Sequence, residues 1–230
     1  MSVSRPLALD VTNATQIQEA VESVESLDLL INNAGIALYE DLSDRSVLEQ
    51  HLAVNLFGPY RITQAFLPLL TRSRGAIVNM SMMAFAPVPL AGAYSISKAA
   101  AFSLTQSLRA LLTRRGVRVH AVLTGPTDTD MTRGFDIPKA SPQSVARAIF
   151  EGVEKGDEDI FPDPMSETMA ESWSNGAAKE PRQRRSQGAG VRRQARPTHT
   201  RRMELERSHP SPSSSRTATS ARAEYFGTRR

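Results

Sequence analysis

Residues 76–98 read AIVNMSMMAFAPVPLAGAYSISK, and this stretch decides the expected fold. It begins with the apolar run 76–80, which is typical of a strand buried on both faces of a parallel sheet. It ends in a helical pattern that covers residues 94–115, and Gly116 is a typical helix end. The stretch therefore predicts one buried strand followed by one helix.

The same alternation extends in both directions along the chain. A Ser-Pro pair at Ser141 and Pro142 is the pattern of a helix cap followed by the first helical residue. The further predicted elements are strand 3–9, helix 14–25, strand 27–31, helix 44–71, strand 117–123, helix 141–153 and strand 159–161. Alternating strands and helices predict an α/β fold with a doubly wound parallel sheet.

The charge of the chain is uneven along its length. Residues 1–179 carry 15 basic and 20 acidic side chains, whereas residues 180–230 carry 13 Arg and 4 Glu. The second segment has three Leu, Ile, Val or Phe residues among 51, so it cannot bury enough apolar surface to offset its ordering entropy. We therefore expect one folded domain over 1–179 and an Arg- and Ser-rich disordered tail over 180–230.

The tail allows three interpretations. It holds no Lys, Asn or Ile, and a shifted reading frame through GC-rich DNA would give this composition. It could instead be a passive disordered tail or an arginine-rich arm that binds nucleic acid. Tyr225 and Phe226 are its two aromatic side chains, and no fold surrounds them, so we do not expect nucleic acid as a partner.

Composition argues against several other classes of protein. The chain has no Cys and four scattered His, which excludes a disulfide scaffold and predicts no metal site. No apolar run approaches the roughly 18 residues that a membrane span needs. Residues 1–6 lack the apolar core of a secretory signal peptide. We expect a cytoplasmic protein without a membrane partner.

Three side chains of the deciding stretch suit proton transfer. Tyr94 and Lys98 are four residues apart near the start of a helix, so they lie on one face. A nearby ammonium favours the phenolate and lowers the pKa of the phenol toward neutrality, as acid–base work requires. Ser81 follows the preceding strand, at the sheet edge where ligands bind, and could hydrogen-bond a carbonyl oxygen. Taken alone, a Tyr–Lys pair is more often an ordinary pair on a helix surface.

The order and spacing of several motifs resemble the short-chain dehydrogenase/reductase family, which binds NAD or NADP on a Rossmann-type sheet. The matching motifs are Leu9-Asp10-Val11-Thr12, Asn32-Asn33-Ala34-Gly35, Val54-Asn55-Leu56-Phe57-Gly58, Ser81, Tyr94 with Lys98, and the loop 125–131. The resemblance covers residues 3–175. It implies an NAD(P)-dependent oxidoreductase that interconverts an alcohol and a carbonyl by hydride transfer.

The resemblance also implies roles for individual residues. Tyr94 would be the general acid in reduction and the general base in oxidation, and Lys98 would also hold the nicotinamide ribose. Ser81 would polarise the substrate carbonyl, and Asn55 would support a water that relays protons through Lys98. The implied cofactor-binding residues are Asp10, Val11, Asn33, Ala34, Gly35, Tyr94, Lys98, Thr127 and Thr129. The implied partners are a small alcohol or ketone substrate and further copies of the chain, in a homodimer or homotetramer built on helices 44–71 and 94–115.

The sequence departs from the family pattern at its beginning. The glycine-rich turn that follows the family's first strand is not found, and Asp10 stands about fifty residues earlier than the family pattern has it. We therefore expect an N-terminally truncated, incomplete sheet, without the first two strands and the residue that selects NAD or NADP. Strand 27–31 would then have an open edge, and the cofactor site would be weakened or absent. The alternative function is a catalytically inactive remnant that dimerises or interacts through its Arg-rich tail.

Overall fold

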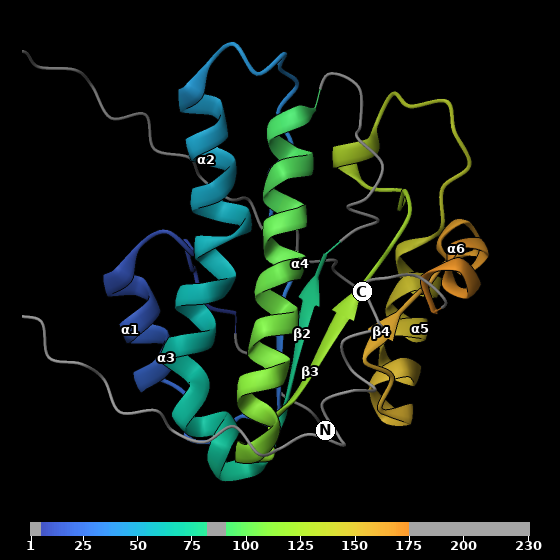
Figure 1. Cartoon of the computed structure of the whole chain (residues 1–230). Coiled ribbons are helices and arrows are strands. Elements are labelled where there is room, and N and C mark those ends of the chain that lie inside the picture. Colours follow the sequence, from blue (N-terminus) through green and yellow to red (C-terminus); the bar gives the residue numbers. More distant parts are fainter. Residues whose placement is uncertain (1–5, 82–90, 175–230) are drawn as a thin grey trace, which may run out of the picture. The chain divides into compact units, whose positions relative to one another are not determined.

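The computed structural model describes residues 6–81 and 91–174 (Figure 1). The four strands form one parallel sheet in the order β1 (Leu29–Asn32), β2 (Ala76–Met80), β3 (Arg118–Val122) and β4 (Asp159–Ile160). The α-helices are α1 (Ala14–Glu22), α2 (Arg45–Asn55), α3 (Phe57–Ser73), α4 (Gly92–Leu112), α5 (Pro142–Lys155) and α6 (Pro164–Ser174). Two short 3-10 helices cover Thr113–Arg115 and Asp130–Thr132.

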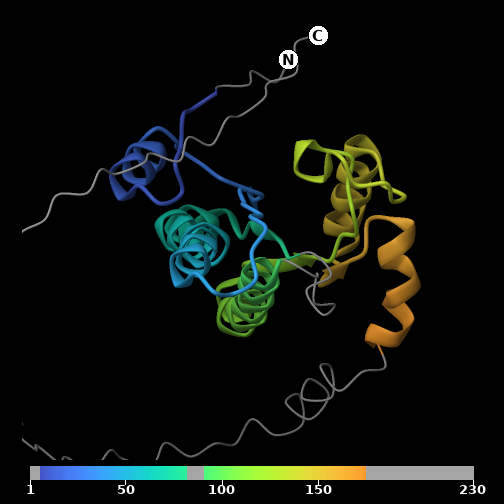
Figure 2. The ribbon, with the colours of Figure 1, turned by 90° about the horizontal axis from the view of Figure 1, so that it is seen from above.

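Helices cover both faces of the sheet, as the view from above shows (Figure 2). On one face, α1, α3 and α4 bury a cluster that includes Leu70 and Leu108 against Ile77 and Val119 of β2 and β3. On the other face, α5 packs against Val78 and Val122 of the same two strands, together with Ile160 of β4. Because neighbouring side chains of a strand point to opposite faces, the continuous apolar runs fill both layers. The predicted α/β doubly wound parallel sheet of Rossmann type is confirmed.

Helix 44–71 was predicted as one element, and this prediction is wrong. The helix ends at Asn55, turns at Leu56 and restarts as α3 at Phe57. Pro59 explains the break, because a proline has no N–H to donate to the carbonyl of Asn55 and its ring crowds that carbonyl. Figure 1 shows α2 and α3 following one another as two helices.

Strand 3–9 is a second prediction that the structure corrects. Residues 6–9 form no regular element, and residues 1–5 lie outside the described part of the chain. A strand needs a neighbour to satisfy its backbone hydrogen bonds, and among the described residues β1 pairs with β2 alone. Ile31 of β1 is 41% exposed. The predicted tail, residues 180–230, also lies outside the described residues, so its boundary stays a prediction.

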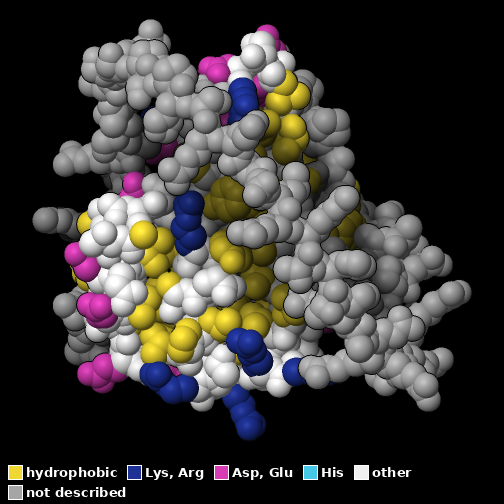
Figure 3. All heavy atoms as spheres, turned by 60° about the vertical axis from the view of Figure 1, so that its left-hand side comes forward, with side chains coloured by type: hydrophobic (Ala, Val, Ile, Leu, Met, Phe, Trp, Pro, Cys, Tyr) yellow, Lys and Arg dark blue, Asp and Glu magenta, His cyan; other side chains and the backbone are white. Residues whose placement is uncertain are grey.

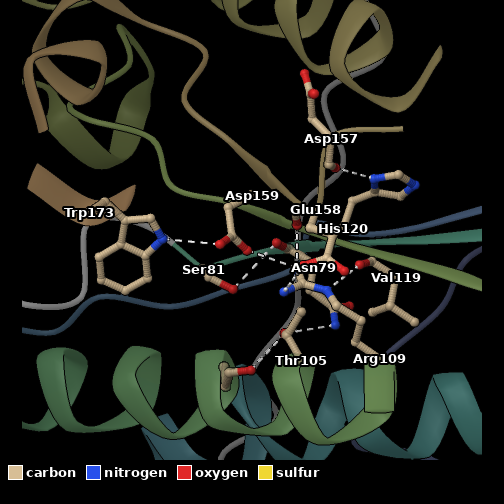
Figure 4. A network of polar contacts seen from close by, with 11 residues as sticks. Asn79, Ser81, Thr105, Arg109, Val119, His120, Asp157, Glu158, Asp159 and Trp173 are labelled. Carbon is tan, nitrogen blue, oxygen red and sulfur yellow. Dashed lines mark hydrogen bonds and ion pairs between the residues drawn. The ribbon is translucent and has the colours of Figure 1, made fainter. Parts of the chain in front are cut away.

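A buried chain of polar side chains joins β1 and β2. Asn32 and Asn79 are register partners, and the amide of Asn32 donates to Asn79 Oδ1 over 2.8 Å. Asn79 Nδ2 donates in turn to Thr105 Oγ1 of α4 over 2.9 Å (Figure 4). Asn32 also reaches Thr63 of α3 over 3.3 Å. These contacts tie the two strands to α3 and α4.

In the part of the chain that the structure describes, no helix is both long enough and apolar enough to cross a membrane.

Candidate active site

The candidate site lies at the carboxyl ends of β1 and β2. Residues 33–35 follow β1 directly and Ser81 follows β2, so parallel pairing brings both segments to one edge of the sheet. Asn55 ends α2, and the first turns of α4 carry Tyr94 and Lys98. Such an edge is where α/β proteins of this type bind ligands.

Three of the predicted site residues meet at Gly35. A methyl group built on Gly35 would stand 3.3 Å from Asn55 Oδ1 and 3.5 Å from Lys98 Nζ. The Gly35 backbone therefore lies directly beside both side chains. A larger residue at this position would occupy the space in front of the lysine ammonium.

The Asn55 side chain is buried and holds the segment after β1. Its Oδ1 accepts a hydrogen bond from the Ile36 N–H over 2.9 Å, and its Nδ2 donates to the Ile36 carbonyl over 2.9 Å. The second Nδ2 hydrogen points to Ser97 Oγ, also at 2.9 Å. A carboxamide has two donors and two acceptor positions, so one acceptor position on Oδ1 remains for a further partner.

Lys98 is buried beside Tyr94. Its Nζ donates to the Met80 carbonyl over 3.0 Å and lies 5.7 Å from the centroid of the Tyr94 ring. The loss of water contact lowers the pKa of Lys98 to about 8, because burial disfavours the charged ammonium.

The expected direction of the Tyr94 pKa is wrong. The phenol is 7% exposed, and burial raises its pKa to about 12 rather than lowering it. Desolvation of the phenolate therefore outweighs the attraction of the nearby ammonium. At neutral pH the phenol keeps its proton, which makes Tyr94 a proton donor in this state.

The loop between β1 and α2 contributes residues that the sequence analysis missed. Glu40 Oε1 accepts a hydrogen bond from the Ala93 N–H over 2.7 Å, in the first turn of α4 where no side chain of that helix serves as a cap. Leu42, with a φ of 66°, packs so closely on Gly92 that a methyl group there would lie 2.8 Å from its Cδ1. These contacts fix the start of α4 and hence Tyr94. The Glu40–Ala93 contact spans 53 residues, so no local pattern would reveal it.

His51 of α2 is a second residue that the sequence analysis missed. It is fully buried, its Nε2 accepts from the Leu38 N–H over 3.0 Å, and its ring meets the Tyr94 ring edge-on at 6.3 Å between centroids. The ring nitrogen Nδ1 lies 2.8 Å from the Val47 carbonyl, one turn earlier in the helix. An accepting Nε2 requires the proton on Nδ1. His51 therefore supports Tyr94 as a neutral, packed side chain.

Ser81 is fully buried at the end of β2. Its N–H donates to the Val122 carbonyl over 2.9 Å, which extends the pairing of β2 with β3 by one residue. Its hydroxyl lies 3.4 Å from the Asn79 carbonyl (Figure 4). The preceding residue, Met80, accepts the hydrogen bond from Lys98 through its backbone carbonyl. Residues 82–90 lie outside the described part of the chain.

The remaining predicted residues lie in two other places. Asp10 forms a local turn in which its Oδ1 accepts from the Thr12 N–H and hydroxyl, and Val11 packs against Gly58 at the start of α3. Thr127 and Thr129 lie in the loop after β3, where their backbone atoms bond to the hydroxyl of Thr132. The contacts of the structure join Gly35, Asn55, Lys98 and Tyr94. Asp10, Val11, Thr127 and Thr129 have the separate contacts just described.

Comparison with known proteins gives consistent matches. The family model described as short chain dehydrogenase matches residues 4–139. A short-chain dehydrogenase of Penicillium crustosum is 42% identical over 131 residues, which are 54% of this chain and 48% of the fungal protein. An uncharacterized oxidoreductase of Staphylococcus epidermidis is 33% identical over 157 residues, 64% of this chain and 68% of that protein.

A solved structure gives the same result. A short chain dehydrogenase from Burkholderia cenocepacia, crystallised in complex with NADP, has a TM-score of 0.69 and 32% identity, covering 78% of this chain and 79% of that chain. The chain spans about half the length of the fungal protein that it matches.

Proposed function

Because the chain belongs to the short-chain dehydrogenase family, we propose that it is an NAD(P)-dependent oxidoreductase that interconverts an alcohol and a carbonyl. The convergence of Gly35, Asn55, Lys98 and Tyr94 at one sheet edge is the observation that supports this proposal. A proton donor, a cation and an open backbone position meet there. This is the combination that proton transfer beside a bound dinucleotide needs.

The described residues fit the nicotinamide riboside end of the cofactor. The bare backbone at Gly35 leaves space in front of Lys98 Nζ, which a methyl group would approach to 3.5 Å. Lys98 would bind the ribose hydroxyls there, and the backbone of residues 33–35 would line the same side. Asp10, Val11, Thr127 and Thr129 remain proposed contacts to the rest of the dinucleotide. The similarity to an NADP complex supports the cofactor class, and the choice between NAD and NADP stays open.

The bound cofactor would supply the hydride, and the protein would supply the proton and the electrostatics. In reduction, Tyr94 would donate its proton to the carbonyl oxygen of the substrate, and Ser81 Oγ would donate a hydrogen bond to the same oxygen. Burial raises the pKa of Tyr94 to about 12, so the phenol holds its proton at neutral pH, and its transfer needs a group that stabilises the phenolate. Lys98 would stabilise the developing phenolate. The one acceptor position that remains on Asn55 would bind a water that returns a proton through Lys98.

A titration of the full chain with NADPH and NADH, followed by fluorescence, tests the proposal. We expect saturable binding of at least one dinucleotide and at least about tenfold weaker binding by Lys98→Met, because a charge-assisted contact is lost. Lys155→Met is the matched control, because Lys155 is exposed near the end of α5, and we expect no change. No binding by the wild type up to millimolar concentrations would refute the proposal.

We also propose a homodimer or homotetramer that uses α3 and α4. The exposed side of α4 carries Ile96 and Leu111, at 44% and 70% exposure, and α3 exposes Phe57 and Tyr60. Figure 3, which brings the side of α1 to α3 forward, shows hydrophobic side chains gathered on this part of the surface. Such patches mark protein contacts. Sedimentation of the wild type and of Leu111→Glu tests this proposal, and a monomeric wild type would refute it. The cytoplasmic location stays a prediction from the sequence.

A further inference from the structure

A buried carboxylate lies where the segment after β4 meets the loop after β3. Asp163 is 3% exposed and stands directly before α6, where its Oδ1 accepts from the Ser166 N–H over 3.0 Å. This is the arrangement of a helix N-cap. Pro164 follows as the first helical residue. Asp163 thus caps its own helix through Oδ1, and Oδ2 makes a separate set of contacts.

The second carboxylate oxygen binds the loop after β3. Asp163 Oδ2 accepts from the Gly125 N–H over 2.7 Å and lies 3.2 Å from Thr124 Oγ1. The Ser166 hydroxyl donates to the same oxygen over 2.9 Å. Among the residues that the structure describes, no Arg, Lys or His forms an ion pair with this carboxylate. The buried charge is therefore balanced by hydrogen bonds, two of which come from residues 38 and 39 positions away.

The loop after β3 packs closely against Asp163 and Met165 at Gly125. A methyl group on Gly125 would stand 2.7 Å from Asp163 Oδ1 and 3.2 Å from Met165 Cβ. The loop continues from Gly125 to Thr127, whose carbonyl accepts from the Thr132 hydroxyl. Asp128 N–H then donates to the Ala140 carbonyl over 2.9 Å. The bond to Asp163 thus fixes the Gly125 N–H, and contacts of Thr132 and Ala140 hold residues 126–128.

The far end of α6 has its own anchor. Trp173 Nε1 donates to Asp159 Oδ2 over 3.0 Å, and its ring meets Phe102 of α4 at 5.3 Å between centroids (Figure 4). Asp159 is in turn bound by Arg109 of α4 over 2.8 Å. Loss of the Asp163 contact would therefore leave α6 attached to the rest of the fold at its carboxyl end.

We propose that Asp163 is a positioning residue, which holds the loop 124–129 in the shape that receives the cofactor through its bond to the Gly125 N–H. This inference rests on the proposed function, which assigns Thr127 and Thr129 to the cofactor. Asp163→Asn is the decisive variant. At Oδ2 the Gly125 N–H can only donate, so an amide nitrogen there would face a donor, and an amide nitrogen at Oδ1 would face the Ser166 N–H.

The experiment compares the full wild-type chain with Asp163→Asn by hydrogen–deuterium exchange and by NADPH titration. Asp44→Asn is the matched control, because Asp44 caps α2 by accepting from the Ser46 N–H and touches no part of the loop. We expect exchange of the amides in 124–132 to rise at least about tenfold and NADPH affinity to fall by a similar factor in Asp163→Asn alone. Emission of Trp173, the single tryptophan of the chain, should stay unchanged, because α6 remains docked.

Each outcome decides the inference. Unchanged exchange in 124–132, or raised exchange with unchanged NADPH affinity, would overturn the positioning role. A shift of the Trp173 emission with exchange raised throughout the chain would show a general structural role and would also overturn it. If the wild type binds neither dinucleotide, the proposed function fails, and the exchange measurement alone then decides whether Asp163 holds the loop. If Asp163→Asn does not fold, Ser166→Ala removes one donor to Oδ2 and should give a smaller change in the same direction.

Discussion

Replacing Lys98 by methionine should stabilise the fold while it weakens the site. Burial lowers the pKa of Lys98 from 10.5 to about 8. At about 1.4 kcal/mol per pH unit, this difference corresponds to a cost of about 3 kcal/mol for keeping the ammonium in the folded state at pH 7. Methionine has a similar length and carries no charge. It loses the hydrogen bond to the Met80 carbonyl, worth about 1–2 kcal/mol. The net expectation is a gain of about 1–2 kcal/mol in the free energy of unfolding.

The burial cost of the Lys98 ammonium gives the free energy of unfolding a characteristic pH dependence. Below pH 8 the ammonium is protonated in both the folded and the unfolded state, so the full cost is present. Between pH 8 and 10.5 the unfolded chain binds more protons than the folded chain, and stability therefore rises with pH. Tyr94 acts in the opposite direction above pH 10, because its pKa is raised to about 12 and the unfolded phenol ionises first. Between pH 8 and 10 the change in the free energy of unfolding therefore reports on Lys98 without an opposing effect of Tyr94.

Urea unfolding of the wild type, Lys98→Met and Lys155→Met at pH 7, 8, 9 and 10 measures this effect. We expect the wild type and the Lys155→Met control to gain about 2 kcal/mol between pH 7 and 10 relative to Lys98→Met. A curve for Lys98→Met that stays parallel to the wild type would show that the ammonium carries no burial cost. Lower stability of Lys98→Met at pH 7 would also refute the reasoning, since the hydrogen bond would then outweigh the desolvation.

Three further results are expected. Arg109→Met should destabilise the fold by about 3–5 kcal/mol in urea, because it leaves the buried Asp159 carboxylate without its cation, and adding Asp159→Asn should restore part of the loss. Gly75→Ala should cost about 1–3 kcal/mol in the same assay, since the added methyl would stand 2.5 Å from the Asp28 carbonyl. Tyr94→Phe should lower the rate of carbonyl reduction about a hundredfold or more with NADPH affinity unchanged, and an unchanged rate would exclude Tyr94 as the proton donor.

Local patterns in the sequence predicted much of the fold. The strand 76–80 has the same bounds in the structure, and Ser141 caps α5 by accepting from the Ser144 N–H as its place before Pro142 predicts. Gly116 takes the left-handed conformation, with a φ of 73°, that ends the helical segment before β3. Each of these signals acts over a few neighbouring residues, so the sequence order alone reveals it.

Other features depend on contacts between distant segments and were not predictable in this way. Helix α6 is an exception, because it was missed although Asp163 and Pro164 repeat the local cap–proline pattern of Ser141 and Pro142. The direction of the Tyr94 pKa depends on how completely the phenol is buried, which no spacing of residues reports. The break at Leu56 was different, because Pro59 is a local signal that the prediction of one helix over 44–71 did not use.

The paired amides of Asn32 and Asn79 have a consequence for the accuracy of the fold. A slip of one residue between two strands that are apolar on both faces would still place apolar side chains in both layers, whereas an amide moved away from its partner would remain unsatisfied at a cost of about 1–3 kcal/mol each. The hydrogen bond between Asn32 and Asn79 therefore stabilises one register of β1 against β2. It fixes the register in which the chain leaves β1 toward Gly35 and leaves β2 toward Ser81. A slip of one residue would displace one strand end relative to the other by about 3.3 Å along the strand direction.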